Sequence, residues 1–148
     1  MPAKTSKKRK QLSGTTRKDR DRGTSGVTLK RCPAPPKHLT DRAKKEWRRL
    51  APIAHGNGYL GKSDLRAFEL LAESLATESE MRELVVNEGV TVSGGSGGLK
   101  AHPALKAMET ARNQATRLLI EFGLTPRSRG SVDPVPKDGQ EKNPFGQI

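Results

Sequence analysis

The sequence EGVTVSGGSGGLKAHPALK, residues 88–106, decides the fold, because it turns the chain back between two long segments with helical periodicity. Gly89 is typical of the end of a helix, and Pro103 suits the first position of the next one, where its missing amide hydrogen costs little. Between them, residues 90–92 and Leu99 flank a glycine-rich stretch and favour two very short strands around a turn. We therefore expect two helices joined by a small β-like, glycine-rich tip.

The segments on both sides of this tip repeat apolar residues at helical spacing. Before the tip, Ser63 can cap a helix that runs to about Glu88. Its apolar stripe consists of Leu65, Phe68, Leu71, Leu75, Leu84 and Val85. After the tip, a helix is expected from Pro103 through Phe122, with Gly123 closing it, and His102 is placed to cap its start. Its apolar face consists of Leu105, Met108, Ala111, Ala115, Leu118, Leu119 and Phe122. These two helices predict a long antiparallel helical hairpin.

A shorter helix is predicted ahead of the hairpin. Thr40 is a suitable N-cap, and Leu39 is placed to pack on the first turn. The apolar residues that follow at helical spacing are Ala43, Trp47, Leu50 and Ala54. Pro52 removes a backbone hydrogen bond, so we expect a kink or an early end there. The predicted fold class is all-α: a short first helix plus the helical hairpin with its small β-like tip, flanked by disordered tails.

Both ends of the chain differ from this central segment in composition. Residues 1–31 carry eleven Lys or Arg against two Asp, so this segment holds +9 of the net charge of +12. From Ser131 onward the sequence is rich in Pro, Asp, Lys and Gly. Such segments bury too little apolar surface to offset the entropy of ordering them. We therefore expect a flexible basic arm at 1–36, a helical domain at 37–130 and a flexible tail at 131–148.

The basic arm is the strongest functional signal in the sequence. A Lys or Arg that pairs with a phosphate releases a condensed counterion, which favours nucleic-acid binding and makes the affinity fall with salt. The alternative is a tail that aids solubility or binds RNA without specificity. The candidate DNA-binding residues are Lys4, Lys7, Lys8, Arg9, Lys10, Arg17, Lys18, Arg20, Arg22, Lys30 and Arg31. Lys100, Arg127 and Arg129 are weaker candidates, chosen from their charge.

Composition also predicts contacts with other protein chains. With 32% hydrophobic and 30% charged residues and few aromatics, the helices are thinly packed as a monomer, which predicts a homo-oligomer. Phe145 and Ile148 stand out in the polar tail as candidate partner-binding residues, the alternative being a frayed terminus. The carboxylates Glu78, Glu80, Glu83 and Glu88 are interpreted as a solvated face. Their alternative role is a contact with Arg48 and Arg49 of a neighbouring copy.

One motif match points to an enzyme, but its context does not. Residues 56–63, GNGYLGKS, satisfy the G-x-x-x-x-G-K-S pattern of a nucleotide-binding P-loop. A P-loop follows a buried strand, whereas residues 46–54 have the periodicity of an amphipathic helix. We therefore interpret residues 61–63 as a helix-start turn and expect no cofactor and no enzymatic activity.

The remaining reactive side chains do not suggest a site either. His38, His55 and His102 are spread along the chain, and with the lone Cys32 they lack metal-ligand spacing. We therefore expect no metal. A single cysteine, together with the lack of a long apolar run, favours a reducing interior and no membrane contact.

Four pieces of the central segment together resemble one branch of the phage terminase small subunits. They are PKHLT at 36–40, EWRRLAP at 46–52, LKAHPALK at 99–106 and EFGLTPRSR at 121–129. The resemblance implies a ring-forming homo-oligomer that binds double-stranded viral DNA in the cytoplasm of the bacterial host. It also implies recruitment of the large terminase subunit and regulation of that subunit's ATPase and nuclease. The alternative function is that of a generic basic nucleic-acid-binding protein of the nucleoid or RNA-binding kind.

Overall fold

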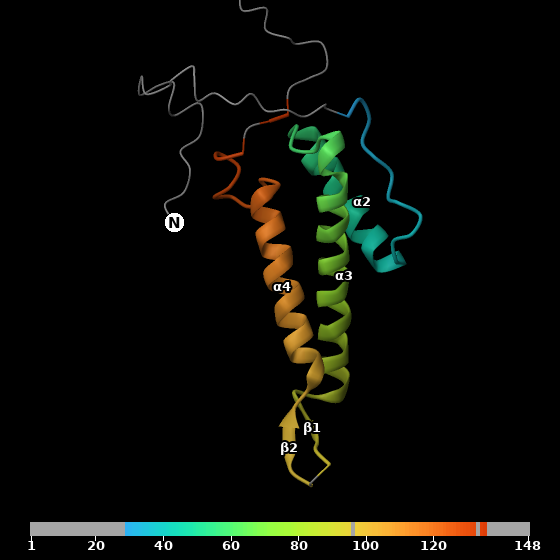
Figure 1. Cartoon of the computed structure of the whole chain (residues 1–148), viewed down its shortest axis with the longest axis vertical. Helices are drawn as coiled ribbons and strands as arrows, with labels where there is room; N and C mark the ends of the chain where they lie inside the picture. Colours follow the sequence, from blue (N-terminus) through green and yellow to red (C-terminus); the bar gives the residue numbers. More distant parts are fainter. Residues whose placement is uncertain (1–28, 96, 133, 136–148) are drawn as a thin grey trace, which may run out of the picture. The chain divides into compact units, whose positions relative to one another are not determined.

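The computed structural model describes residues 29–95, 97–132, 134 and 135, and this part of the chain is mostly helical (Figure 1). Its helices are α2 (Asp41–Gly56), α3 (Leu65–Glu88) and α4 (Pro103–Glu121), and a 3-10 turn, η2 (Lys62–Asp64), precedes α3. The short strands β1 (Thr91–Ser93) and β2 (Leu99–Ala101) lie between α3 and α4 in the sequence. The prediction of a mostly helical chain is therefore confirmed, with a small antiparallel sheet added to it.

The chain divides into two compact units. We call the first the hairpin unit; it consists of Ala34–Leu50 and Arg66–Leu119. The second we call the turn unit; its described part consists of residues 29–33, 51–65, 120–132, 134 and 135. Helix α2 contributes its first part to the hairpin unit and its last part to the turn unit.

Helix α2 begins where the sequence predicts it. Thr40 Oγ1 accepts a hydrogen bond from the Ala43 amide at 3.2 Å, as an N-cap residue does. Leu39, just before this cap, is buried, which fits its expected packing on the first turn. The cap and its flanking apolar residue therefore fix the start of the helix.

Pro52 does not end α2, which continues to Gly56. Proline in a helix interior removes one hydrogen bond, so other contacts must hold the turn that follows it. Ala51 and Ala54, on either side of Pro52, are both buried. An early end at Pro52 is therefore not observed, because packing of the last turn of α2 outweighs the lost hydrogen bond.

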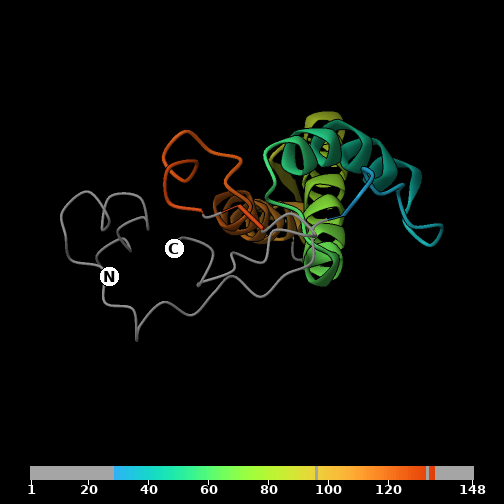
Figure 2. The same ribbon diagram turned by 90° about the horizontal axis from the view of Figure 1, so that it is seen from above.

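In the hairpin unit, α3 lies between the first part of α2 and α4, as both views show (Figures 1 and 2). Trp47 of α2 meets Phe68 of α3 edge to face, with ring centroids 5.0 Å apart, and both side chains are buried. The other buried apolar residues of this unit are Leu39, Ala43, Leu71, Ala72, Ala76, Ala104, Ala111 and Ala115. Helix α4 thus buries alanines, and the larger residues of the predicted face that lie within it, Leu105, Met108, Leu118 and Leu119, are only half-buried. Phe122, the last member of that face, follows α4 and is buried.

The two strands extend the hairpin unit beyond the ends of α3 and α4 (Figure 1). They pair antiparallel, with Thr91 opposite Ala101, Val92 opposite Lys100 and Ser93 opposite Leu99. The Gly94 amide donates to the Gly98 carbonyl at 2.7 Å beyond the last pair. Gly89 follows α3 with a φ of +93°, which confirms its predicted role as the helix end.

His102 forms the start of α4. Its Nδ1 accepts a hydrogen bond from the Ala104 amide at 3.0 Å, which confirms the predicted capping role. Its Nε2 lies 3.0 Å from Glu88 Oε2, and its backbone amide donates to the Val90 carbonyl at 2.9 Å. The imidazole is buried, so both ring nitrogens find their partners within the protein.

Candidate nucleic-acid interface

The described end of the predicted basic arm belongs to the turn unit. Lys30 and Arg31 are both exposed there. The carbonyl of Leu29 accepts a hydrogen bond of 2.8 Å from Nε2 of His55, in the last turn of α2. The base of the arm is therefore attached to the turn unit.

The other predicted contact residues lie outside the described part of the chain. For DNA binding these are Lys4, Lys7, Lys8, Arg9, Lys10, Arg17, Lys18, Arg20 and Arg22. The two predicted partner-binding residues, Phe145 and Ile148, also lie outside it. The interface is therefore built from the described residues of the turn unit, which include two of the weaker DNA-binding candidates.

A turn that follows α4 is held by the hydroxyl groups of Thr125 and Ser128. These two oxygens lie 2.7 Å apart, and each also bonds to the backbone of the other residue. Ser128 is only 5% exposed. The Thr-Pro-x-Ser spacing is a signal for such a hydroxyl-held turn, because Ser and Thr side chains bond readily to nearby backbone. The sequence-based predictions did not include it.

Tyr59 connects this turn with the residues that follow α2. Its hydroxyl donates to the Arg129 carbonyl at 3.1 Å. Its ring lies so close to Gly123 that a Cβ atom there would be 2.9 Å from Tyr59 Cε2. Gly123 also has a φ of +63°, a conformation that favours glycine. The packing of Tyr59 thus requires glycine at this position and fixes the backbone of Arg129.

The rest of the turn unit packs around a small apolar core. Leu60 and Phe122 are buried there together with Ala51 and Ala54. The Val135 amide donates to the Gly58 carbonyl at 2.8 Å, so the chain returns to the segment after α2. These contacts give the turn a fixed support within the unit.

Positive charge in the turn unit meets few carboxylates. Its exposed cations are Lys30, Arg31, Lys62, Arg127 and Arg129, and none of them forms an ion pair within the described residues. Asp64 is partly buried and bonds to the Gly61 amide and the Ser63 hydroxyl, which leaves Glu121 as the exposed carboxylate of the described part of this unit. An anionic ligand would therefore meet largely unopposed charge here.

The positive charge of the hairpin unit is mostly neutralised, because most of its arginines pair with carboxylates. The pairs are Arg42–Glu83, Arg49–Glu46, Arg66–Glu69, Arg82–Glu78 and Arg112–Glu78. Lys100, the third of the weaker DNA-binding candidates, is exposed on β2 and belongs to this unit, whereas Arg127 and Arg129 belong to the turn unit. Of these three candidates, the turn unit brings together only the two arginines.

Residues 56–63 do not have the geometry of a P-loop. They follow helix α2 rather than a strand, and the described strands form an antiparallel pair. The Gly61 amide donates to Asp64 Oδ2 at 2.9 Å, so it is already bound within the chain. The expected cap at Ser63 is wrong: its hydroxyl donates to Asp64 Oδ1, and the Asp64 carboxylate caps the turn. An acid three residues after Gly61 reaches back to that amide more readily than Ser63 does.

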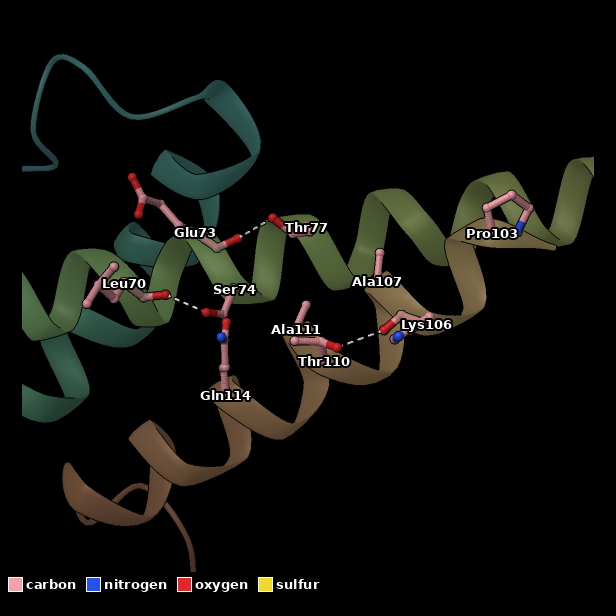
Figure 3. A pocket seen from close by; sticks show the side chains of 10 residues that line it. All are labelled: Leu70, Glu73, Ser74, Thr77, Pro103, Lys106, Ala107, Thr110, Ala111 and Gln114. Atoms are coloured by element: carbon pink, nitrogen blue, oxygen red, sulfur yellow. Dashed lines mark hydrogen bonds between the residues drawn. The ribbon is translucent and has the colours of Figure 1, made fainter. Parts of the chain in front are cut away.

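A groove of about 590 Å³ lies between α3 and α4 in the hairpin unit (Figure 3). Leu70, Ser74, Ala107 and Ala111 are among its lining residues. The hydroxyls of Ser74, Thr77 and Thr110 each donate to the carbonyl four residues earlier on their own helix (Figure 3). Because these donors are satisfied, the groove presents mainly methyl and methylene groups to a binding partner.

Glu78 connects α3 with α4 and is not part of a solvated face. It is 7% exposed and accepts hydrogen bonds from Arg82, on its own helix, and from Arg112 Nη2 at 2.9 Å. Desolvation raises the pKa of this carboxyl, but the hydrogen bonds and charges of the two arginines outweigh it and hold the pKa below the ordinary 4.5. Glu83 likewise pairs with Arg42, whose guanidinium lowers its pKa. The solvated-face interpretation is therefore wrong for Glu78.

Two further findings concern metals and membranes. Within the described ranges, no group of three or more His, Cys, Asp or Glu is placed to hold a metal ion. Among the same residues, no helix has the length and apolar character needed to cross a membrane. Neither finding identifies a partner, so the arrangement of charge in the turn unit remains the most informative feature.

Comparison with known proteins gives one match. A family model described as phage terminase, small subunit, matches residues 43–139, which is more than half of the chain. The matched segment begins within α2 and extends past the turn held by Thr125 and Ser128. No curated protein and no solved structure matches the chain with significance.

Proposed function

Because the chain belongs to the phage terminase small subunit family, we propose that it is the DNA-binding and regulatory subunit of a terminase. Membership of this family assigns the chain a general role in phage genome packaging, and it is the observation that carries the proposal. In this role the protein binds double-stranded viral DNA, assembles into a homo-oligomer, and recruits and regulates the large subunit. The large subunit supplies the ATPase and nuclease, and this chain has no catalytic activity of its own.

The basic arm is the proposed DNA contact. Its net charge of +9 over residues 1–31 supports this role, as does the exposure of Lys30 and Arg31 at its base. If about six phosphates are contacted, the logarithm of the binding constant falls with the logarithm of salt concentration with a slope near −5. Such contacts provide affinity rather than recognition of a base sequence.

The test compares the full chain with a variant lacking residues 1–28, using fluorescence anisotropy on a labelled DNA duplex at several salt concentrations. This cut keeps Leu29, whose carbonyl bonds to His55. We expect a large loss of affinity and a much shallower slope. A full-length control with residues 2–28 in scrambled order keeps the charge and should bind like the natural chain. Unchanged affinity after the deletion, or a flat salt response of the full chain, would refute the role of the arm.

Assembly into an oligomer is supported by apolar surface that one chain leaves uncovered. The exposed large aliphatic residues of the hairpin unit are Leu70, Leu84, Val86, Val90 and Leu99. Together with the groove between α3 and α4, they offer area for contacts between copies. Light scattering at micromolar concentration should therefore give a mass several times that of one chain, and a monomer would contradict this part of the proposal.

Recruitment of the large subunit is the third part of the proposal. We assign it to Phe145 and Ile148, which lie outside the described residues. The double variant Phe145→Ala and Ile148→Ala should lose stimulation of the ATPase of the large subunit while keeping its DNA affinity. Equal affinity for RNA and unrelated DNA, with no effect of the natural chain on the large subunit, would instead favour a generic nucleic-acid-binding protein.

A further inference from the structure

We propose that the turn after α4 is a rigid phosphate-binding element that holds double-stranded DNA through Arg127 and Arg129. This inference rests on the proposed DNA-binding function and adds a second contact, built into the fold, to that of the arm. Both side chains are exposed, and neither is engaged by a carboxylate within the described residues. Arginine is suited to this role, because its planar guanidinium can bind two phosphate oxygens at once.

The backbone that carries the two arginines is held from within the turn. The amides of Ser128 and Arg129 both donate to the Thr125 carbonyl at 3.2 Å. The amides of Ser131 and Val132 donate in turn to the Ser128 carbonyl, at 2.9 Å and 3.2 Å. With the hydroxyl bonds of Thr125 and Ser128 added, successive backbone groups on both sides of Arg127 are fixed.

A second restraint comes from outside the turn. The Tyr59 hydroxyl donates to the Arg129 carbonyl at 3.1 Å, and the Tyr59 ring packs against Gly123 at the entrance of the turn. The hydrogen bond joins residues that are 70 positions apart in the sequence. Because the backbone is already ordered, binding a phosphate here costs mainly the freedom of the two side chains.

The charge of the turn unit favours an anion. Lys30, Arg31 and Lys62 are exposed in the same unit, Asp64 is partly buried and already hydrogen-bonded, and Glu121 is the one exposed carboxylate among the described residues of the unit. The positive charge of the arm lies in the N-terminal segment, whereas Arg127 and Arg129 are carried by backbone that hydrogen bonds hold in place. Fixed phosphate contacts set the position of the duplex on a protein. We therefore assign the turn the task of positioning DNA that the arm has captured.

The test compares two double variants of the full chain that lose the same charge. One is Arg127→Ala with Arg129→Ala. The matched control is Lys45→Ala with Arg117→Ala, which removes two exposed cations of the hairpin unit that form no ion pair within the described residues. Anisotropy with a labelled duplex should show the salt slope of the first variant reduced by about 1.8, at 0.9 per phosphate. This corresponds to a loss of affinity of up to about 60-fold at 0.1 M salt, and the control should change little.

A third variant tests the rigidity of the turn without changing its charge. Ser128→Ala removes the hydroxyl that bonds to Thr125, and circular dichroism checks that the helices are retained. We expect it to weaken DNA binding several-fold, because the arginines then have to be ordered on binding. Unchanged affinity of Ser128→Ala in a folded protein would overturn the claim of a preorganised site.

The remaining outcomes separate this inference from the proposed function. If the natural chain binds DNA and loses affinity on deletion of the arm, but the two double variants behave alike, the turn is not a DNA contact while the proposed function stands. If the natural chain does not bind duplex DNA, both are refuted. A preference for single-stranded RNA of the same length over the duplex would also overturn the assignment of the turn to double-stranded DNA.

Discussion

Replacing Glu78 by Gln should lower the stability of the hairpin unit more than any exposed charge replacement does. Glu78 is 7% exposed and accepts hydrogen bonds from arginines on two different helices. Glutamine keeps the shape of the side chain, removes the charge and replaces one of the two acceptor oxygens, both of which bond to Arg82, by an NH2 group that cannot accept. The change therefore removes the ionic part of two pairs, one within α3 and one between α3 and α4.

The magnitude follows from the exposure of the two arginines. A hydrogen bond to a charged group contributes about 1.5–3 kcal/mol when it is buried. The side chains of Arg82 and Arg112 are 59% and 53% exposed, so water screens both pairs and reduces each to about 0.5–1 kcal/mol. Loss of both should therefore lower the free energy of unfolding by about 1–2 kcal/mol, and the midpoint of thermal unfolding by roughly 5–10 °C.

The assay is thermal and urea unfolding followed by circular dichroism at fixed protein concentration, since assembly would make the midpoint depend on concentration. The matched control is Glu83→Gln, which removes the exposed pair with Arg42 on the surface of the same unit. A double-mutant cycle of Glu78→Gln with Arg112→Ala measures the contact between the helices directly. The reasoning is refuted if Glu78→Gln costs no more stability than Glu83→Gln, or if the cycle shows no coupling.

Three further predictions concern pH, the core and the turn. Because the folded-state pKa of Glu78 is lowered, its contribution to stability is present above about pH 4.5 and is lost as the pH falls through the lowered value; urea unfolding at pH 3 and pH 6 should show this loss, and Glu78→Gln should reduce the difference. Trp47→Ala should destabilise the protein by about 3–5 kcal/mol in urea unfolding, because the ring is buried against Phe68; a loss below 1 kcal/mol would contradict the described core. Gly123→Ala should cost about 1–3 kcal/mol in thermal unfolding, because a Cβ at a φ of +63° meets the Tyr59 ring; an unchanged midpoint would show that this packing is not tight.

The positions of the helices follow from local signals, which is why the sequence predicts them. Thr40 and His102 act as caps, and Gly89 ends α3, because each role depends on neighbours a few residues away. The groups that cap a helix end lie within about one turn of it. Pro52 is the exception: the local signal favours a kink or an early end of α2, and the helix continues past it to Gly56, with its last turn buried at Ala54.

The packing of α4 was less predictable, because it depends on where α3 lies. Periodicity identifies the apolar stripe but not which of its members face the partner helix. Ala111 and Ala115 are buried, while Leu105 and Met108 are half-buried. The sequence pattern places Glu78 on a solvated face for a similar reason, since its partner Arg112 is 34 residues away and no local pattern joins them.

The candidate interface also has a part that the sequence predicts and a part that only the fold reveals. The charge of the arm is a property of composition and is evident in the sequence. The support of Arg129 by Tyr59 is not, because it joins residues 70 positions apart. Lys62 lies within the P-loop-like segment, and its membership of the same unit as Arg127 and Arg129 becomes evident only from the fold. Chemistry that resides in one segment can be predicted from sequence, whereas chemistry assembled from several segments requires the fold.

The imidazole of His102 has a consequence for how the strand pair behaves. Because Nδ1 accepts from Ala104, the ring's single proton in the neutral form lies on Nε2 and points to Glu88, while the backbone amide is bound to Val90. One residue thereby clamps the last turn of α3, the entry to β1 and the first turn of α4. Because its side chain holds both helix ends beside the strand entry, replacing His102 should release the two helix ends at the base of the strand pair together.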